Sequence, residues 1–315
     1  MYESFFAFKE KPFSLTPNPR FLFLSKTHNE VYAHLIYGIE TRTGFVEVTG
    51  EVGTGKTTIL RTLLSHLDED KYRVAFIFNP KLTAFELLRN INREFGVADD
   101  GLSNPDLIHS LNQFLLAENR AGKTPILVID EAQNLSGEVL EQIRLLSNLE
   151  TEEDKLIQII LVGQPELSEM LNSHALRQVG QRITLSYQLS PLTFNECKEY
   201  IQYRINIAAQ RSAIKFDRGA YRHIFKYSKG IPRLINIVCD RSLLTAFVMN
   251  QFKISAHIAK ASVKELASRG QPKSDGITTG KWALIGISFL SVVFLVAVFY
   301  QPIREAFTAP FTGQD

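Results

Sequence analysis

The sequence predicts an α/β protein made of a doubly wound, parallel-sheet domain, a small helical domain and one C-terminal transmembrane helix. Three observations lead to this prediction. Apolar, β-branched runs alternate with helical patterns in residues 1–189, the pattern is helical only in residues 190–267, and a run without charge covers residues 282–300. Strands that are buried on both faces and that alternate with helices are typical of doubly wound folds.

Composition limits the classes of protein to consider. The chain has 315 residues, of which 45% are hydrophobic and 22% are charged, as in ordinary globular proteins. The net charge of +2 is not a strong basic excess, so the charge of the whole chain does not indicate nucleic-acid binding. The two cysteines, Cys197 and Cys239, are far apart and lack paired Cys/His spacing. A disulfide scaffold or a zinc site is therefore not predicted, and a reducing compartment fits.

The predicted elements follow one another in a regular order. Residues 1–40 form an N-terminal segment punctuated by prolines, with an amphipathic stretch from His28 to Glu40. A short strand at Gly44–Gly50 runs into a glycine-rich turn and a helix, TTILRTLLSHL. Further strands are predicted at YRVAFIFNP, TPILVID and KLIQIILVGQPEL, with helices at AFELLRNINREFG and DLIHSLNQFLLAENRAG between them.

The glycine-rich turn, GEVGTGKTT, contains the pattern G-x-x-x-x-G-K-T between a strand and a helix. Glycines allow successive backbone N–H groups to point at phosphate oxygens, and the helix N-terminus adds a favourable dipole. Lys56 reaches the β- and γ-phosphates in this motif, and the Thr57 hydroxyl is a ligand of Mg²⁺. The predicted ATP-binding residues are Gly50, Glu51, Val52, Gly53, Thr54, Gly55, Lys56, Thr57 and Thr58.

A second part of the site follows the strand ILVID. This strand delivers Asp130 and Glu131 to the carboxyl edge of the sheet, where open α/β folds bind their ligands. Asp130 is predicted to hold Mg²⁺, directly or through water, and Glu131 to orient and polarise the attacking water. Phosphoryl transfer depends on such positioning and charge neutralisation, so the pair favours hydrolysis over binding alone.

Three polar features come after this pair in the chain. Gln164 ends the next strand, where its side chain could lie between Glu131 and the γ-phosphate. Arg177 and Arg182 precede another short strand, and Arg233 begins a helix of the small domain. The order of these residues is more informative than any one of them.

This ordered set is similar to that of the AAA+ ATPases. More narrowly, the chain resembles the ExeA/GspA group linked to type II secretion, which includes MshM-like proteins of pilus biogenesis. The resemblance covers roughly residues 1–265. The segments that carry it are PFSLTPNPRFLFLS, GFVEVTGEVGTGKTT, DEAQNLS, LVGQPEL, LRQVGQRI and GIPRLIN.

The resemblance implies roles that spacing alone does not give. Gln164 would be the sensor 1 residue, and Arg233 would be the sensor 2 residue that contacts the nucleotide from the lid. Arg177 or Arg182, with Arg182 favoured, would be an arginine finger that completes a neighbour's site. Such a finger requires a ring-type homo-oligomer. The resemblance also implies an inner-membrane partner similar to GspB/ExeB.

The C-terminal run from Trp282 to Tyr300 has 19 residues without a charge. A helix of this length spans roughly 28 Å, close to the hydrocarbon thickness of a bilayer. Only Ser288 and Ser291 interrupt its apolar character, and Trp282 and Tyr300 lie at its ends, where amphipathic rings prefer the interface. A single transmembrane helix in the bacterial inner membrane is predicted.

Residues 268–281 are polar and rich in Gly, Ser, Thr and Pro, which predicts a flexible linker. Arg269, Lys273 and Lys281 precede the span and Arg304 follows it, so the ATPase domain is expected in the cytoplasm. A short periplasmic tail, 301–315, is too small to bury a core. Contact with peptidoglycan is therefore expected only through a partner.

The leading hypothesis is a membrane-anchored, Mg²⁺-dependent ATPase that drives or gates assembly of an envelope secretion or pilus machine. The alternative is a nucleotide switch that acts on DNA, similar to transposition regulators or initiator ATPases, which share the core motifs. The predicted span, the modest net charge and the lack of a recognisable helix-turn-helix argue against DNA. A weakly catalytic scaffold, in which ATP only locks a ring, is a third possibility.

Overall fold

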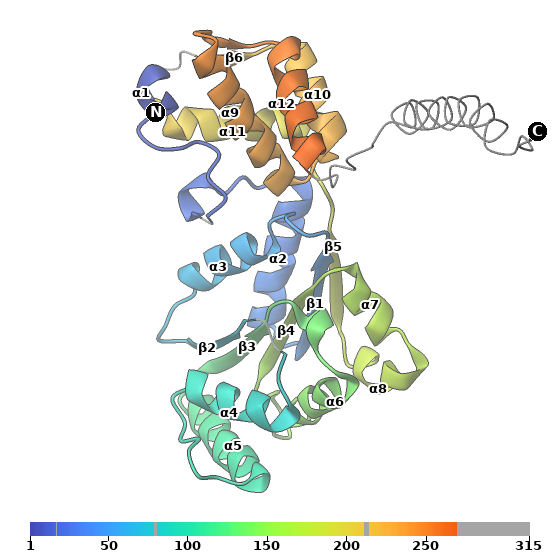
Figure 1. Ribbon diagram of the computed structural model, residues 1–315. Coiled ribbons are helices and arrows are strands. Elements are labelled where there is room, and N and C mark those ends of the chain that lie inside the picture. Colours follow the sequence, from blue (N-terminus) through green and yellow to red (C-terminus); the bar gives the residue numbers. More distant parts are fainter. Residues whose placement is uncertain (17, 79–80, 211–213, 270–315) are drawn as a thin grey trace, which may run out of the picture. The chain divides into compact units, whose positions relative to one another are not determined.

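A computed structural model describes residues 1–269 except 17, 79–80 and 211–213 (Figure 1). Residues Met1–Lys264 form one compact unit. The predicted membrane span 282–300, the tail 301–315 and all but the first two residues of the predicted linker lie outside the described residues. Within the described ranges, no helix is both long and apolar enough to cross a membrane.

The centre of the first domain is a sheet of five parallel strands in the order β2-β3-β4-β1-β5 (Figure 1). The α/β fold with a parallel sheet, predicted from the alternation of strands and helices, is therefore confirmed. The strands are β1 (Phe45–Gly50), β2 (Tyr72–Ile77), β3 (Thr124–Ile129), β4 (Gln158–Gly163) and β5 (Leu185–Leu189).

Helices cover both faces of this sheet. Alternate residues of each strand point to opposite faces, so Ile126 and Val128 of β3 pack with α2 (Lys26–Glu40) and α3 (Lys56–His66). Leu127 and Ile129 pack on the opposite face. The helices of that face are α4 (Ala84–Glu94), α5 (Asn104–Arg120), α6 (Gly137–Leu146), α7 (Pro165–Leu171) and α8 (Arg177–Gly180).

The region after β5 is mainly helical, as the sequence indicates, but it also contains two short strands that were not predicted. β6 (Lys215–Phe216) and β7 (Lys253–Ile254) pair in parallel. The helices are α9 (Phe194–Ala208), α10 (Arg218–Ser228), α11 (Pro232–Val248) and α12 (Ala256–Arg269). Each strand has only two residues, too few for an apolar alternation to appear in the sequence.

The N-terminal segment was grouped with the ATPase domain in the sequence analysis, but its first residues contact the helical region. Helix α1 (Tyr2–Phe5) precedes a bridge between Phe8 and Ala209. Lys9 N–H donates a hydrogen bond of 2.7 Å to the Ala208 carbonyl at the end of α9. The Tyr2 hydroxyl donates to Asp240 of α11. Phe6 is buried, and its ring packs against Phe252, which follows α11 in the helical region.

Candidate functional site

The phosphate-binding loop connects β1 to α3. Gly53 and Gly55 have φ values of 85° and 108°, in the left-handed region that favours glycine. A Cβ on Gly53 would lie 2.6 Å from Cβ of Arg233, so this loop also needs glycine for close packing against α11. The Arg233 N–H donates a 3.2 Å hydrogen bond to the Gly53 carbonyl. The loop is therefore in direct contact with the helical domain.

Lys56 begins α3 and is 6% exposed. Its Nζ donates hydrogen bonds of 2.6 Å to the Gly50 carbonyl and 3.1 Å to the Glu51 carbonyl. Burial lowers the pKa of Lys56, while the nearby Glu131 and Asp130 carboxylates oppose that shift. The ammonium group of Lys56 thus lies inside the loop. Phosphate oxygens bound there could replace the two carbonyls as its hydrogen-bond acceptors.

Thr57 and Asp130 are adjacent although 73 residues separate them in the chain. Thr57 Oγ1 donates a 2.7 Å hydrogen bond to Asp130 Oδ2, and the Glu131 N–H donates to Asp130 Oδ1 at 2.9 Å. Burial raises the pKa of Asp130, and these two hydrogen bonds partly oppose the shift.

The chemistry of this pair fits Mg²⁺. Among the described residues there is no group of three or more His, Cys, Asp or Glu side chains that could hold a metal ion. Mg²⁺ in nucleotide sites usually needs only one or two protein oxygens, because phosphates and water complete its octahedron. One hydroxyl and one carboxylate at the loop therefore satisfy what the ion requires of the protein.

Glu131 lies in a small network of amides. Gln164 Nε2 donates to Glu131 Oε2 at 3.2 Å, which brings together two residues singled out in the sequence. Gln133 Nε2 donates to the same oxygen at 2.7 Å, and Gln133 Oε1 accepts the Gln164 N–H at 3.1 Å. Glu131 itself adopts a left-handed backbone conformation, with φ of 56°. Gln133 was not predicted, although its position within DEAQ could have drawn attention to it.

Strand order explains how these groups meet. β4 lies between β1 and β3. Residues after the carboxyl ends of these three strands therefore share one edge of the sheet, with Gln164 between the phosphate-binding loop and Glu131.

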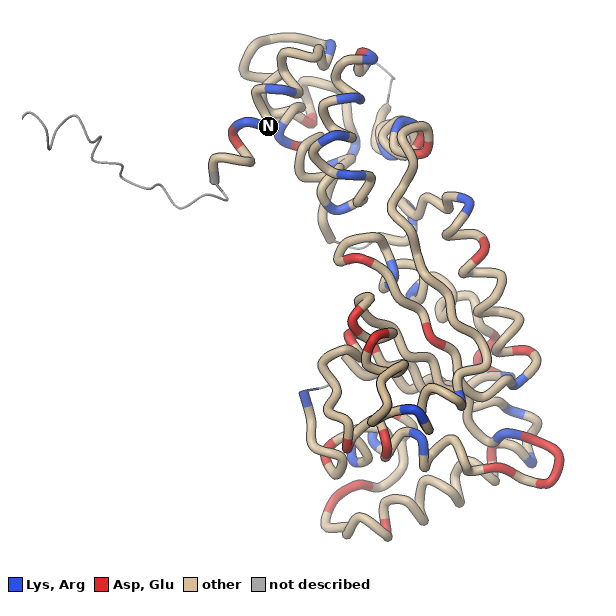
Figure 2. Tube along the Cα trace, turned by 90° about the vertical axis from the view of Figure 1, so that its right-hand side faces the viewer, with Lys and Arg blue, Asp and Glu red and all other residues tan. Residues whose placement is uncertain are grey.

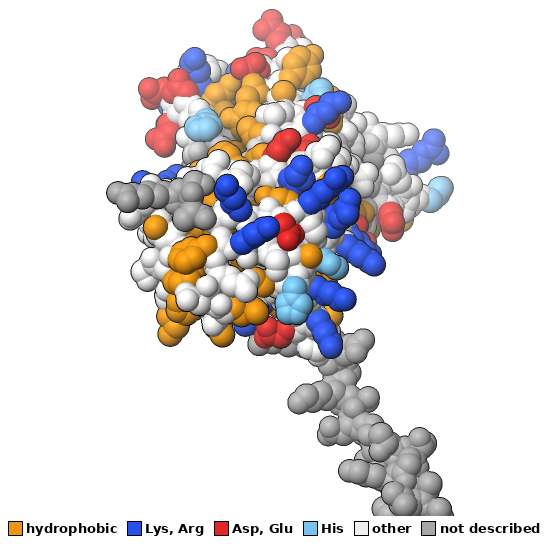
Figure 3. Space-filling view, turned by 90° about the horizontal axis from the view of Figure 1, so that it is seen from above, with side chains coloured by type: hydrophobic (Ala, Val, Ile, Leu, Met, Phe, Trp, Pro, Cys, Tyr) orange, Lys and Arg blue, Asp and Glu red, His pale blue; other side chains and the backbone are white. Residues whose placement is uncertain are grey.

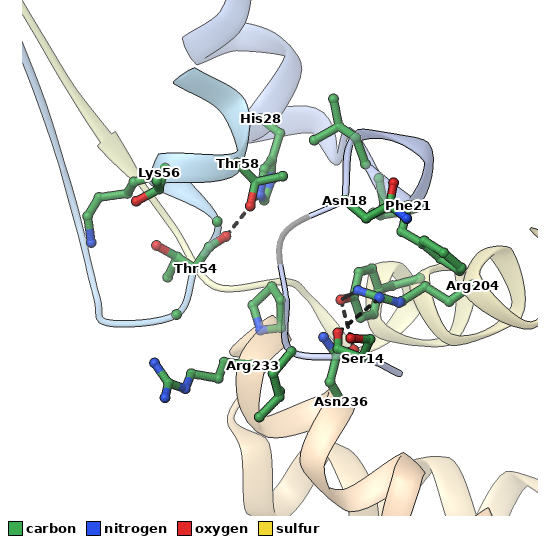
Figure 4. A pocket seen from close by; sticks show the side chains of 18 of the residues that line it. Ser14, Asn18, Phe21, His28, Thr54, Lys56, Thr58, Arg204, Arg233 and Asn236 are labelled. Atoms are coloured by element: carbon green, nitrogen blue, oxygen red, sulfur yellow. Dashed lines mark hydrogen bonds between the residues drawn. The ribbon is translucent and has the colours of Figure 1, made fainter. Parts of the chain in front are cut away.

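A cavity of about 320 Å³ lies beside the loop (Figure 4). Its lining includes Lys56, Thr57, Glu131 and Arg233. The remaining lining residues come from the N-terminal segment, the loop and the helical domain: Ser14, Leu15, Thr16, Asn18, Phe21, Leu22, Phe23, His28, Val52, Gly53, Thr54, Gly55, Thr58, Leu192, Tyr200, Arg204, Pro232 and Asn236. The sequence did not predict that Ser14, Leu15, Thr16, Asn18, Phe21, Leu22 and Phe23 line this cavity.

His28 holds the loop from α2. Its Nε2 lies 3.0 Å from the Thr54 carbonyl (Figure 4). Its Nδ1 lies 2.6 Å from Ser25 Oγ. Because a carbonyl can only accept, Nε2 is the donor, and the neutral imidazole can accept at Nδ1. His28 is 4% exposed, and burial lowers its pKa. This histidine is therefore a structural support of the phosphate-binding loop.

Arg204 of α9 holds the N-terminal segment at the rim of the cavity. Its Nε donates a 2.6 Å hydrogen bond to the Pro12 carbonyl, and a terminal nitrogen donates to the Ser14 carbonyl at 3.2 Å. The other terminal nitrogen donates to the Tyr200 hydroxyl at 2.8 Å, and the guanidinium lies 4.7 Å from the Phe21 ring centroid. This arginine is 6% exposed, and carbonyl, hydroxyl and aromatic partners satisfy it.

The two candidate arginine fingers lie apart from the cavity. Arg177 at the start of α8 and Arg182 before β5 are exposed, and neither lines the cavity. Arg233, in contrast, lines it from α11 (Figure 4). The protomer alone therefore brings together every predicted site residue except these two.

The site combines a phosphate-binding loop, a hydrogen-bonded Thr57–Asp130 pair and a glutamate held by two amides, at the edge of a parallel sheet. These features define a P-loop ATPase. A family described as "AAA domain" matches residues 39–171. General secretion pathway protein A of Aeromonas hydrophila is 46% identical over 255 residues, which cover 81% of this chain and 46% of that protein. The chain is an AAA-domain ATPase similar to this GspA protein, and it spans about half the length of that curated relative.

Solved structures share the fold at low identity. The ORC2 protein of Aeropyrum pernix in its ADP form aligns with a TM-score of 0.63 and 18% identity, over 82% of this chain and 73% of that one. Cdc6p of Pyrobaculum aerophilum gives 0.61 and 20%, over 83% and 74%. The RuvB branch migration motor of Thermotoga maritima gives 0.53 and 19%, over 78% and 73%. These likenesses establish the fold alone.

Proposed function

We propose that this ATPase is Mg²⁺-dependent, anchored in the bacterial inner membrane, and drives or gates the assembly of an envelope secretion or pilus machine. The proposal rests on one observation: Lys56, Thr57, Asp130 and Glu131 lie together in one site, in a chain that is 46% identical to a general secretion protein.

In this proposal the phosphates of ATP bind along the backbone of residues 50–58, at the N-terminus of α3. Lys56 exchanges its hydrogen bonds to the Gly50 and Glu51 carbonyls for phosphate oxygens. Thr57 and Asp130 would hold Mg²⁺, which when bound neutralises charge on the phosphate oxygens. The hydrogen bond between these two side chains supports this assignment, because it shows that the two oxygens are close enough to bind the same ion.

Glu131 would accept a proton from the attacking water and orient it. Gln164 and Gln133 each donate to Oε2 of Glu131, which supports this role because the carboxylate is held in one orientation. Oε1 is not part of these two hydrogen bonds, which leaves it available to a water molecule.

Arg233 would contact the nucleotide from the helical domain, and Arg182, or else Arg177, would reach the site of a neighbouring subunit. Arg177 and Arg182 are exposed and do not line the cavity of their own protomer, which supports a role in the site of a neighbour. A ring-type homo-oligomer with ATP at subunit interfaces follows from this assignment.

The proposed location rests on the apolar run 282–300, on the linker 268–281 before it, and on the relative's part in general secretion. The ATPase domain would face the cytoplasm, where ATP is found. A partner similar to GspB would receive the motion of the helical domain and would supply any contact with peptidoglycan.

The test uses the full-length Glu131→Gln protein, which should bind ATP and hydrolyse it poorly. It would be crosslinked in native membranes with and without ATP, and its neighbours would be identified by mass spectrometry. Lys56→Ala is the control, since it should remain in the membrane but not respond to ATP.

ATP-dependent capture of an inner-membrane or periplasmic secretion or pilus component would support the proposal. Capture of DNA-bound complexes without an envelope partner would replace it with the alternative of a nucleotide switch on DNA. Loss of Lys56→Ala from the membrane would contradict the expectation that anchoring is independent of nucleotide.

A further inference from the structure

Charge is divided unevenly along the chain. Residues 190–268 contain 13 Lys and Arg but only 5 Asp and Glu, a net charge of +8, whereas residues 1–189 contain 18 and 25, a net charge of −7. The overall net charge of +2 conceals this difference. In Figure 2 blue positions outnumber red ones in the helical domain, whereas blue and red positions are mixed around the sheet. A domain with this excess attracts anionic partners.

Helix α10 carries part of this charge in one stripe. Arg218, Arg222 and Lys226 are spaced four apart, which places them on one side of the helix. All three side chains are exposed. None of them forms an ion pair with an acidic side chain in the part of the chain that the structure describes. Their charge is therefore available to a partner.

Helix α12 carries a second stripe, formed by the exposed residues His257, Lys260 and Lys264. Asp217 joins the starts of the two helices, because its carboxylate accepts hydrogen bonds from the Ala220 N–H at 2.6 Å and the Ala256 N–H at 3.1 Å.

The two stripes begin beside each other. A Cβ on Gly219 of α10 would be 2.7 Å from Cβ of Ala256 of α12, so these residues mark where the helices face each other. The two helices start at the same end of the domain, where Asp217 joins their first turns. Arg218 and His257 are each next in sequence to these contacting residues, so the two stripes begin at this contact.

These residues form one basic face with the lysines of the adjoining strands. Lys215 of β6 and Lys253 of β7 are paired in register and exposed. We define the basic face as Lys215, Arg218, Arg222, Lys226, Lys253, His257, Lys260 and Lys264.

An apolar loop adjoins the basic face between α11 and β7. Val248, Met249 and Phe252 are 76%, 45% and 50% exposed, and Lys253 follows directly. Phe252 is held by stacking on Phe5 at 4.5 Å between ring centroids. Figure 3, which views the end of the molecule that carries β6, shows Lys and Arg side chains gathered beside apolar ones.

We propose that the basic face and the apolar loop dock the helical domain on the surface of a bilayer that contains anionic phospholipid. Basic residues are attracted to anionic headgroups, while exposed aliphatic and aromatic side chains enter the interfacial region. Nucleic acid would satisfy the charges but would leave Val248 and Met249 in water. This docking involves only residues before 265 and does not depend on the proposed membrane span.

The test measures the approach of the apolar loop to lipid. The full chain with Met249→Cys would carry a fluorophore at that position and be reconstituted with vesicles that contain spin-labelled quencher lipid. One set of vesicles would be phosphatidylcholine alone, and the other would be mixed with phosphatidylglycerol. The native Cys197 and Cys239 are buried, and burial raises the pKa of Cys197 to about 12, so they should stay unlabelled.

We expect quenching only with phosphatidylglycerol, and we expect it to weaken as salt is added. The triple variant Arg218→Glu, Arg222→Glu, Lys226→Glu should reduce the ratio of docked to free domain at least tenfold, because each basic residue near an anionic surface strengthens binding about fivefold. The matched control reverses three exposed charges of the other domain, Lys71→Glu, Lys81→Glu and Arg120→Glu, and should dock normally. ATP hydrolysis in detergent would verify that both variants fold.

Equal quenching in the two kinds of vesicle, or equal docking by the two triple variants, would overturn the proposal. If a duplex oligonucleotide binds the wild type but not the first triple variant while lipid has no effect, the basic face would be a nucleic-acid surface instead. If that variant changes only the size of the oligomer, the face would be an interface between copies.

Discussion

The Gln164 side chain donates a hydrogen bond to Glu131 Oε2 at 3.2 Å, across 33 residues of sequence. The two residues follow neighbouring strands, β4 and β3. Gln133 donates to the same carboxylate oxygen at 2.7 Å. A carboxylate held by two amides in this way has a fixed orientation toward the phosphate-binding loop, and each part of that arrangement can be tested by substitution.

Replacement of Glu131 should separate binding from hydrolysis. Glu131→Gln keeps the size of the side chain but removes the base, so we expect kcat to fall by about 100-fold or more while the nucleotide affinity stays close to that of the wild type. Steady-state hydrolysis and fluorescent-nucleotide binding measure the two quantities. Glu138→Gln, on the first turn of α6, is the control and should hydrolyse normally. Retention of activity by Glu131→Gln would remove this residue from the mechanism.

Gln133 should act as a positioning residue. Gln133→Ala removes its hydrogen bonds to Glu131 Oε2 and to the Gln164 N–H, and we expect kcat to decrease by about tenfold with KM unchanged. Asn134→Ala, at the exposed neighbouring position, should have no effect. A rise in KM at constant kcat would indicate that Gln133 contributes to nucleotide binding instead.

The close contact between Gly53 and Arg233 can be tested by comparing an alanine substitution at Gly53 with one at Gly122. Gly53→Ala and Gly122→Ala both place a Cβ on backbone with positive φ, 85° and 75°, which costs about 1–2 kcal/mol. Only the Cβ at Gly53 meets another atom, 2.6 Å away on Arg233, whereas the Cβ at Gly122 has no neighbour within 4 Å. We therefore expect Gly53→Ala to lose nucleotide binding as well as stability in urea unfolding. Similar behaviour of the two variants would show that the loop and α11 separate readily.

His28 should make stability depend on pH. Burial lowers the pKa of His28, so below about pH 6.5 the unfolded chain binds a proton that the folded protein still excludes. The free energy of unfolding should then fall as the pH decreases from about 6.5 toward the lowered pKa, by at most about 1.4 kcal/mol per pH unit.

His28→Gln tests this origin. The glutamine amide can still donate to the Thr54 carbonyl but does not titrate, so we expect a flatter dependence of unfolding free energy on pH. His174→Gln, at an exposed position, should keep the wild-type dependence. Urea unfolding at a series of pH values measures both, and an unchanged slope in His28→Gln would assign the effect to other groups.

Arg182 should act on a neighbouring subunit. Arg182→Ala and Glu131→Gln should each be nearly inactive alone, but their mixture should regain hydrolysis, because one supplies intact sites and the other supplies intact arginines. Arg177→Ala is the comparison. If mixing rescues Arg177→Ala, and Arg182→Ala is active alone, the finger is Arg177. If neither variant loses activity, hydrolysis does not require a residue from a neighbour.

Much of the site could be predicted from local patterns. The segment GEVGTGKTT carries its glycines, Lys56 and Thr57 in one continuous loop, so its conformation depends mostly on its own residues. Asp130 and Glu131 follow a fully buried strand, and the end of a parallel strand lies at the ligand-binding edge of the sheet. These residues can be identified because each motif contains both the reactive side chains and the sequence pattern of the strand or loop that carries them.

The contacts of Gln133, His28 and Arg204 could not be predicted in this way. Gln133 and His28 hydrogen-bond to groups on other elements, and Arg204 lies against a segment nearly 200 residues earlier. An isolated glutamine, histidine or arginine has no sequence pattern that distinguishes a buried partner from solvent. The asymmetry of charge could be counted from the sequence, but the exposure of the basic residues and the contact between the starts of α10 and α12 could not.

The sequence by itself determined the class of fold, the nucleotide chemistry and the residues of the loop, because these depend on short-range periodicity and on motifs that are continuous in the chain. Only the tertiary structure decided that β4 lies between β1 and β3, that the N-terminal segment lines the nucleotide cavity, and that Arg233 reaches the cavity while Arg182 does not. The reason is physical: strand order and domain contacts are chosen by the burial of whole apolar faces, to which residues far apart in the chain contribute together.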